Sequence, residues 1–335
     1  MATHISGAKR GGSSASGGYS IRQLPVNLFA SVMGITGLSL AWRMAVNLLS
    51  LPALPGEVLG WTGLAVFIAL ISSYAVKFAR HPAAVHAEFT HPIMGNFFGT
   101  IAIGILLLSA FLFRYSAVIS EIVWISGVLL TFTLAYIVVQ KFLTSPQKVE
   151  TTVPPLLIPG VATLDIPVTG SSMPFSWAHE VNLFAFATGS VMALVLVVLI
   201  FQRLRHFETL TPASRPVLMV LVAPFGVGFI AYTNLGTIDM LASVLIYFGW
   251  FLLLVLTPVI FRSENSFGVA WWAIGFPMAA LSIASFRYAE ATGGPILLIL
   301  AELLFGFLAL SISILFVRTL HLVLSGSLWR FESAG

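Results

Sequence analysis

The stretch from Phe267 to Glu290 carries residues whose types and spacing favour a transport role. It is long and apolar enough to cross a bilayer, but Gly275 and Pro277 interrupt it near its middle. Pro277 has no N–H to donate to the carbonyl of Ala273, and a membrane tolerates such a break only where protein or a water-filled cavity satisfies the freed group. At helical spacing, Phe276 shares a face with small side chains and one cation: Ala273, Ala280, Ala284 and Arg287. We interpret this face as the wall of a narrow pathway that a phenyl ring crosses.

Charged residues within the apolar stretches are the other candidates for chemistry. Arg43 and Arg287 are expected at the non-cytoplasmic ends of their stretches, where each either concentrates anions at a pore mouth or anchors its helix at the interface. Arg287 has the stronger case as a mouth cation, because it shares a face with Phe276. Asp165 either carries a proton for symport, repels divalent anions, or occupies a wet vestibule. Glu302 is interpreted as a contact between protomers or a hydrogen-bonding group.

The sequence offers no pattern for catalysis or metal binding. His81, His86 and His91 are spaced five residues apart around Glu88, which is not the spacing of a metal site, and we interpret them as a helix boundary and a solvated loop. Cysteine is absent, and neither a nucleophile elbow, a phosphate loop nor an H-E-x-x-H motif occurs. We therefore predict no enzyme activity, catalytic residue, cofactor or metal.

Composition sets the class of protein that must position these residues. Of the 335 residues, 58% are hydrophobic and only 8% are charged, whereas soluble domains carry roughly 25% charged residues. Too few charges remain to cover a water-facing surface, so we predict an all-α polytopic membrane protein. The net charge of +4 is explained by basic cytoplasmic loops, and no nucleic-acid partner is predicted.

Windows of about 20 apolar residues predict ten membrane spans. Their limits are 25–48, 57–77, 92–113, 117–140, 155–174, 180–202, 214–234, 239–261, 268–290 and 295–324. The fifth is the weakest, because Pro159, Asp165 and Pro167 dilute it. This gives a disordered cytoplasmic tail at 1–22, a transmembrane domain at 23–325 and a short cytoplasmic tail at 326–335. With both termini inside a bacterial-type inner membrane, all basic residues except Arg43, Arg114 and Arg287 fall on the cytoplasmic side.

Prolines recur along the chain at intervals of about 60 to 70 residues, which indicates a two-helix unit repeated five times. The recurring positions are Pro25, Pro92, Pro154, Pro216 and Pro277. The odd spans either pack closely through their small residues or line a pathway. Further prolines expected at mid-depth, Pro159, Pro167 and Pro224, favour the pathway, because packing alone does not need them.

Four motifs make the chain resemble the tellurite-resistance/dicarboxylate transporter family, which includes bacterial TehA and the plant slow anion channels. They are LPVNLFASVMGITGLSLAWR, RHPAAVHAEFTHPI, LVAPFGVGFIAYTN and AWWAIGFPMAALSIASFRYAE, in order between Leu24 and Arg318. The resemblance implies ten helices in five hairpins with quasi-fivefold symmetry around a central pore. It also implies that odd helices line the pore, that even helices form an outer ring and that three protomers associate as a homotrimer.

The resemblance also implies roles for individual residues. Phe276, in the matched Phe-Pro-Met motif, is the expected pore gate. The expected pore-lining or kink positions are Phe29, Gly34, Pro159, Asp165, Pro224, Phe225, Gly275 and Pro277. Asp165 departs from the family pattern, in which this position is apolar or carries an amide.

Three functions follow as hypotheses. The first is a channel for small monovalent anions, and the second is a proton-coupled secondary carrier for C4-dicarboxylates or sulfite. The third is a membrane scaffold or sensor without transport. The odd spans lack the paired basic residues at mid-depth that a dicarboxylate site needs, and weak binding suits rapid flux, so the channel is favoured.

Overall fold

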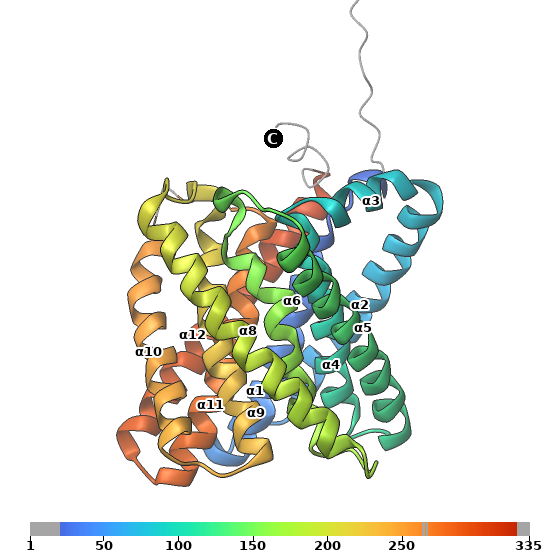
Figure 1. Cartoon of the computed structure of the whole chain (residues 1–335). Coiled ribbons are helices and arrows are strands. Elements are labelled where there is room, and N and C mark those ends of the chain that lie inside the picture. Colours follow the sequence, from blue (N-terminus) through green and yellow to red (C-terminus); the bar gives the residue numbers. More distant parts are fainter. Residues whose placement is uncertain (1–20, 263–264, 266, 327–335) are drawn as a thin grey trace, which may run out of the picture.

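The computed structural model describes residues 21–262, 265 and 267–326, and these residues fold into a bundle of helices (Figure 1). Within this part of the chain, nine helical segments are long and apolar enough to cross a membrane, and no β-strand occurs. The all-α polytopic class predicted from composition is confirmed. Of the expected tails, residues 1–20 and 327–335 lie outside the described residues, and Arg22 belongs to the 3₁₀ helix η1 (Ile21–Gln23).

The long spans alternate along the chain between an inner and an outer position. The inner helices are α1 (Ala30–Leu49), α4 (Phe98–Leu112), α9 (Ala223–Leu235) and α11 (Gly275–Thr292). The outer helices are α2 (Leu54–Arg80), α5 (Ala117–Thr144), α8 (Ala178–His206), α10 (Met240–Ile260) and α12 (Pro295–Leu324). In an apolar stretch of 18 residues within each span, between 56% and 83% of the residues are buried in the inner spans, against 17% to 33% in the outer spans. The odd spans of the sequence are therefore the core of the bundle.

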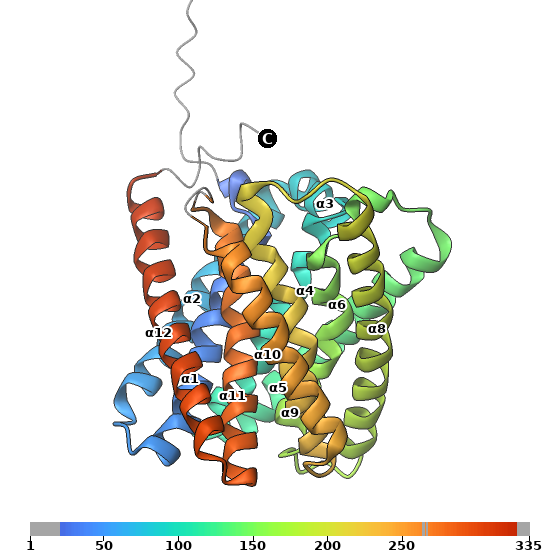
Figure 2. The same ribbon diagram turned by 90° about the vertical axis from the view of Figure 1, so that its left-hand side faces the viewer.

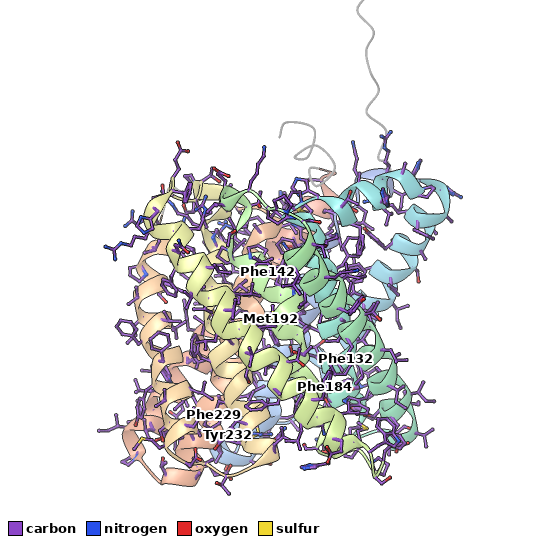
Figure 3. The ribbon with its side chains drawn as sticks, viewed as in Figure 1. Phe132, Phe142, Phe184, Met192, Phe229 and Tyr232 are labelled. Atoms are coloured by element: carbon purple, nitrogen blue, oxygen red, sulfur yellow. The ribbon has the colours of Figure 1, made fainter. Side chains whose placement is uncertain are left out.

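The outer helices present large apolar side chains to the surroundings. On α8, Val191, Leu194 and Val198 are each more than half exposed. Phe132 of α5 and Phe184 of α8 lie against each other on this surface, with ring centroids 5.3 Å apart (Figure 3). A surface of this composition is stable in lipid and not in water, because hydrocarbon chains solvate it at no hydrophobic cost.

The inner segments form a closed ring. α1 packs against α4, α4 against the short helices of residues 154–170, these against α9, α9 against α11, and α11 back against α1. Each outer helix covers the groove between two neighbours in this ring; α2 lies on α1 and α4, for example, and α12 on α11 and α1. Figure 2 shows α1, α11 and α12 next to one another in the bundle.

Each long inner segment begins as a 3₁₀ helix and changes to an α-helix further along. The 3₁₀ helices are η2 (Val26–Phe29), η3 (Met94–Phe97), η7 (Pro212–Val222) and η8 (Val269–Ile274). Pro277 is the third residue of α11, so its missing N–H falls just where the hydrogen-bond pattern widens from i→i+3 to i→i+4. The break expected from Gly275 and Pro277 is thus a change of helix type.

The predicted span at 155–174 is not one continuous helix. Four short pieces follow one another: η5 (Pro154–Leu156), α6 (Leu157–Val161), η6 (Ala162–Asp165) and α7 (Ile166–Gly170). Pro159 and Pro167 explain the interruptions, because each lacks the N–H that a continuous α-helix requires. Nearly all residues of this segment are buried, as in the other inner segments.

A buried ion pair fixes one end of the bundle. Lys77 of α2 is 1% exposed, and its Nζ lies 2.6 Å from both the Glu88 carboxylate and the carbonyl oxygen of Leu24. Tyr74 also donates to Glu88, at 2.6 Å. Glu88 belongs to α3 (Pro82–Thr90), so the solvated loop expected between His81 and His91 is instead largely a helix. Lys77, Arg80, Lys141 and Arg205 lie at this end, which we call the basic end.

We predict that Gly226→Ala destabilises the contact between α9 and α11. The added Cβ would lie 2.7 Å from the backbone nitrogen of Leu281 and 3.0 Å from the carbonyl carbon of Ala280, and backbone atoms cannot rotate away. Overpacking of this kind costs about 1–3 kcal/mol. The unfolding temperature of the detergent-purified protein should fall, as measured by the gel-filtration peak that survives heating.

Gly306→Ala in α12 is the matched control, because no atom lies within 4 Å of the added Cβ. It should leave the unfolding temperature unchanged or raise it slightly, since alanine favours a helix over glycine by about 1 kcal/mol. Equal unfolding temperatures for both variants would contradict the close packing of α9 on α11.

Candidate functional site

A small cavity lies at the centre of the ring of inner segments. Side chains from all of these segments line it, among them Met33, Thr100, Asp165, Ala223 and Phe276. It has about 30 Å³ of room for the centres of water molecules, and one water needs about 10–15 Å³ measured in this way. The centre of the bundle is therefore nearly closed, with space for one or two small species.

The cavity is at the level where the inner segments change helix type. Ala30 is the first residue of α1, Ala223 is the first of α9, and Phe97 is the last of η3. Trp272, Ala273, Phe276 and Pro277 come from the η8–α11 junction. The backbone irregularities that accompany the prolines of the inner segments thus surround one central space. A membrane tolerates irregular backbone only where it is buried in protein or lines a cavity.

Phe276 and Trp272 are the large rings on one wall of the cavity. Phe276 is 6% exposed. Trp272 is fixed by a hydrogen bond of 2.8 Å from its Nε1 to Oγ1 of Thr319 on α12. Nothing holds Phe276 by a polar bond, because its ring has no donor or acceptor. The sequence singled out Phe276 but missed Trp272, although both belong to the same motif.

Asp165 is the one ionisable residue that lines the cavity in the described part of the chain. It is 2% exposed, and neither carboxyl oxygen has a hydrogen-bond partner. The second polar lining residue, Thr100, uses its hydroxyl to donate to the carbonyl oxygen of Phe97 at 2.6 Å. An unpartnered carboxyl group at this depth is costly, which makes Asp165 the main candidate for a functional residue in this cavity.

Other residues selected from the sequence face away from the cavity. The ring of Phe29 packs against Phe67 and Tyr74, and the ring of Phe225 packs against Phe248 of α10 at 4.7 Å. Helical spacing in the sequence did not reveal where the rings of Phe29 and Phe225 point, because each residue lies next to a change of helix type.

The other glycines and prolines selected from the sequence, Pro277 excepted, lie at helix contacts, near a helix start or in a separate cavity. Gly34 and Gly275 meet where α1 crosses α11, and a Cβ on Gly275 would lie 2.9 Å from Cα of Gly34. Pro224 is the second residue of α9. Pro159 lines a separate cavity of about 290 Å³ near the basic end, together with Lys141.

Arg287 lies at the end of the bundle opposite the basic end. Its Nη1 donates to Oδ1 of Asn234 at 2.6 Å, and Nδ2 of Asn234 donates to the carbonyl oxygens of Pro167 and Val168 at 3.0 Å. This chain of bonds joins α11, α9 and α7. Arg287 also borders an open pocket of about 320 Å³ with Glu290. The arginine is thus both a structural link and a cation at the surface of the bundle.

The turn between α9 and α10 forms part of the same pocket, through Gly236 and Ile238. Asp239 ends this turn as the N-cap of α10 and accepts from the backbone N–H groups of Leu241 and Ala242. The hydroxyl of Tyr232 also donates to Asp239, and this bond, followed by the backbone bonds, lowers the pKa of the carboxyl group.

Arg43 is committed to a different network at this end. Its Nε and Nη2 donate to the two carboxylate oxygens of Glu57 at 3.1 and 2.8 Å, and its Nη1 donates to the carbonyl oxygen of Phe111. Arg114 and Tyr115 bind the same carboxylate. Arg43 therefore ties α1 to α2 and α4, which differs from both of the roles considered for it from the sequence.

Comparison with known proteins identifies relatives over most of the chain. The family profile described as voltage-dependent anion channel, SLAC1, matches residues 23–320. The chain is 30% identical over 267 residues to the tellurite resistance protein TehA homolog of Haemophilus influenzae, an alignment that covers 77% of this chain and 79% of that protein.

Plant proteins are also similar. The chain is 28% identical over 313 residues to S-type anion channel SLAH2 of Arabidopsis thaliana, covering 89% of this chain and 59% of the relative. It is 26% identical over 314 residues to the guard cell S-type anion channel SLAC1 of the same plant, with coverage of 89% and 55%. The resemblance inferred from the four motifs is confirmed.

We predict that Asn234→Ala lowers stability, because it removes the amide that joins Arg287 to α7. Two backbone carbonyls and one guanidinium lose their partner, and each such loss costs about 1–3 kcal/mol. The exposed Asn47 of α1 supplies the control, since Asn47→Ala removes an amide from the same end of the bundle. Thermal unfolding in detergent should separate the two variants, and equal stability would contradict the linking role of Asn234.

Proposed function

Because the chain belongs to the voltage-dependent anion channel family, we propose that it is a membrane channel that passes small monovalent anions. The observation that carries this proposal is the central cavity, to which every inner segment contributes side chains. The named plant relatives are anion channels. An aqueous path along the axis of the ring would meet apolar walls and few charges, and weak binding permits rapid passage.

We further propose that residues 154–170 make the tenth crossing, in five hairpins related by quasi-fivefold symmetry. The support is the regular alternation of inner and outer segments, with each outer helix covering a groove between two inner segments. The excess of lysine and arginine at the basic end supports a cytoplasmic position for that end and for both termini, in a plasma membrane.

We propose that the ring of Phe276 closes the pathway. It borders the narrow cavity and is held only by packing, so a rotation or a small movement of the η8–α11 junction would displace it. A hydrophobic constriction of this kind blocks ions by excluding water. Of the other residues selected from the sequence, Asp165 and Pro277 share the lining with Phe276.

We propose that the protein forms a homotrimer, as its resemblance to the transporter family implies, and the position of Glu302 supports contact between protomers. This residue is exposed on α12, among apolar side chains that suit lipid. A carboxylate on such a face is costly in hydrocarbon, so contact with a second protomer would stabilise it.

The alternative is a proton-coupled carrier for C4-dicarboxylates or sulfite, and Asp165 is the observation that favours it. Against it, no basic side chain lines the central cavity within the described residues. Recordings with substituted anions would decide between the two, because a channel gives currents that rise linearly with driving force, whereas a carrier gives saturable, proton-linked uptake.

We predict that Phe276→Ala increases anion conductance, because it removes the ring from the narrowest part of the pathway. Currents carried by chloride and nitrate should be recorded in planar bilayers or oocytes, with expression matched to wild type. Phe225→Ala is the control, since this ring lies against α10 instead of the cavity. Unchanged current in a well-expressed Phe276→Ala protein would remove the gate assignment.

We predict that Arg287→Gln reduces anion current mainly at low salt. A cation at a pore mouth raises the local anion concentration, and salt screens this effect over about 10 Å at 0.1 M. Arg114→Gln, an exposed cation at the same end, should have a smaller effect because its charge is paired with Glu57. A reduction that persisted unchanged at high salt would point to the structural bond with Asn234 instead.

A further inference from the structure

The carboxyl group of Asp165 has no structural task in the described part of the molecule. Asp165 directly precedes α7, a position where a carboxylate usually accepts from the first backbone N–H groups of the helix. Here it makes no such bond, and Pro167 at the second position of α7 has no N–H to offer. The carboxyl group is free to interact with whatever enters the cavity that it lines.

No charged group neutralises this carboxyl group from the neighbouring elements. The elements packed against η6 are α4, α5, α6, α7, α8 and α9. Their titratable or charged residues are Glu121, Tyr136 and Lys141 on α5, His179, Glu180, Arg203, Arg205 and His206 on α8, and Tyr232 on α9. None of these lines the cavity, and neither Arg43 of α1 nor Arg287 of α11 does so. The charge state of Asp165 therefore decides the local electrostatics.

The surroundings suit a proton better than a metal cation. A bound cation such as Mg²⁺ or Ca²⁺ needs several oxygen ligands. Thr100 offers only one further hydroxyl oxygen, and no second carboxylate borders the space among the described residues. A proton needs only one carboxyl oxygen and no additional room.

We propose that Asp165 is a proton-dependent switch for anion passage, an inference that rests on the channel function proposed above. The protonated carboxyl group donates its O–H to an anion in the cavity, whereas the ionised carboxylate repels that anion in surroundings that screen charge poorly. Binding of one proton thus changes the narrowest part of the pathway from repulsive to attractive for an anion. Acidification increases anion flux, and Asp165 is the group that binds the proton.

The test is anion efflux from liposomes that contain the purified full-length chain, measured over a series of pH values. Chloride and nitrate are the probes, because their own charge does not change over this range. Each variant is studied alone and combined with Phe276→Ala, so that gate opening does not limit the flux. With Asp165 present, flux should rise by at most about tenfold for each unit of acidification, since a single proton is bound, and then level off.

Asp165→Asn should give high flux that no longer depends on pH, because the amide is nearly identical in size and always neutral. Asp165→Glu should retain the rise in acid. Thr163→Val is the matched control: Thr163 is buried in the same 3₁₀ helix but does not line the cavity, so the variant should keep the wild-type profile.

Three outcomes would overturn the switch. The first is an unchanged pH profile in Asp165→Asn, and the second is a fall of flux in acid for the unmodified protein. The third is a fixed ratio of protons to anions transported, detected with a pH-sensitive dye inside the liposomes, which would instead support a coupled carrier. The channel proposal itself fails if no protein, including Phe276→Ala, conducts anions at any pH, so the two failures are distinguishable.

Discussion

Backbone hydrogen bonding inside a membrane constrains this structure more than any single contact. Hydrocarbon offers no partner for a free N–H or C=O group, so a helix that changes type must do so where protein covers it. The inner segments satisfy this requirement by placing their 3₁₀-to-α junctions around one central space. The outer helices, which are continuous and apolar, then separate these junctions from lipid.

The charged residues are distributed in a way that follows from the same constraint. Lys77 with Glu88, and Arg43 with Glu57, are paired near opposite ends of the bundle, where they join neighbouring helices. Arg287 adds a third link through Asn234. Among the described residues, the centre is left with mainly apolar side chains, the hydroxyl group of Thr100 and one carboxyl group, that of Asp165. Under the proposed channel function, a pathway with this lining would bind anions weakly, and protonation of Asp165 would change the charge that a passing anion meets.

Sequence patterns predicted the helical membrane class and the order of the nine long spans in the described residues, because apolar composition and span length are local properties. Ten spans were expected, and the fifth is a series of four short helices. The sequence patterns also identified Phe276 and Asp165, which the structure brings to one cavity. They did not predict that Phe29 and Phe225 face outer helices, since a change of helix type alters the direction of the following side chains. Pro159 and Pro167 divide the fifth segment more completely than its average hydropathy suggested.

The sequence by itself determined that the chain is a helical membrane protein of the anion channel family with breaks at recurring prolines. Hydrophobic length and missing N–H groups act within a few residues, so they can be read along the chain. Only the tertiary structure decided which side chains meet at the centre, and it placed Trp272 and Thr100 there beside three residues selected from the sequence, Phe276, Asp165 and Pro277. It also showed that the carboxyl group of Asp165 has no hydrogen-bond partner among the described residues, because that depends on what every neighbouring segment contributes.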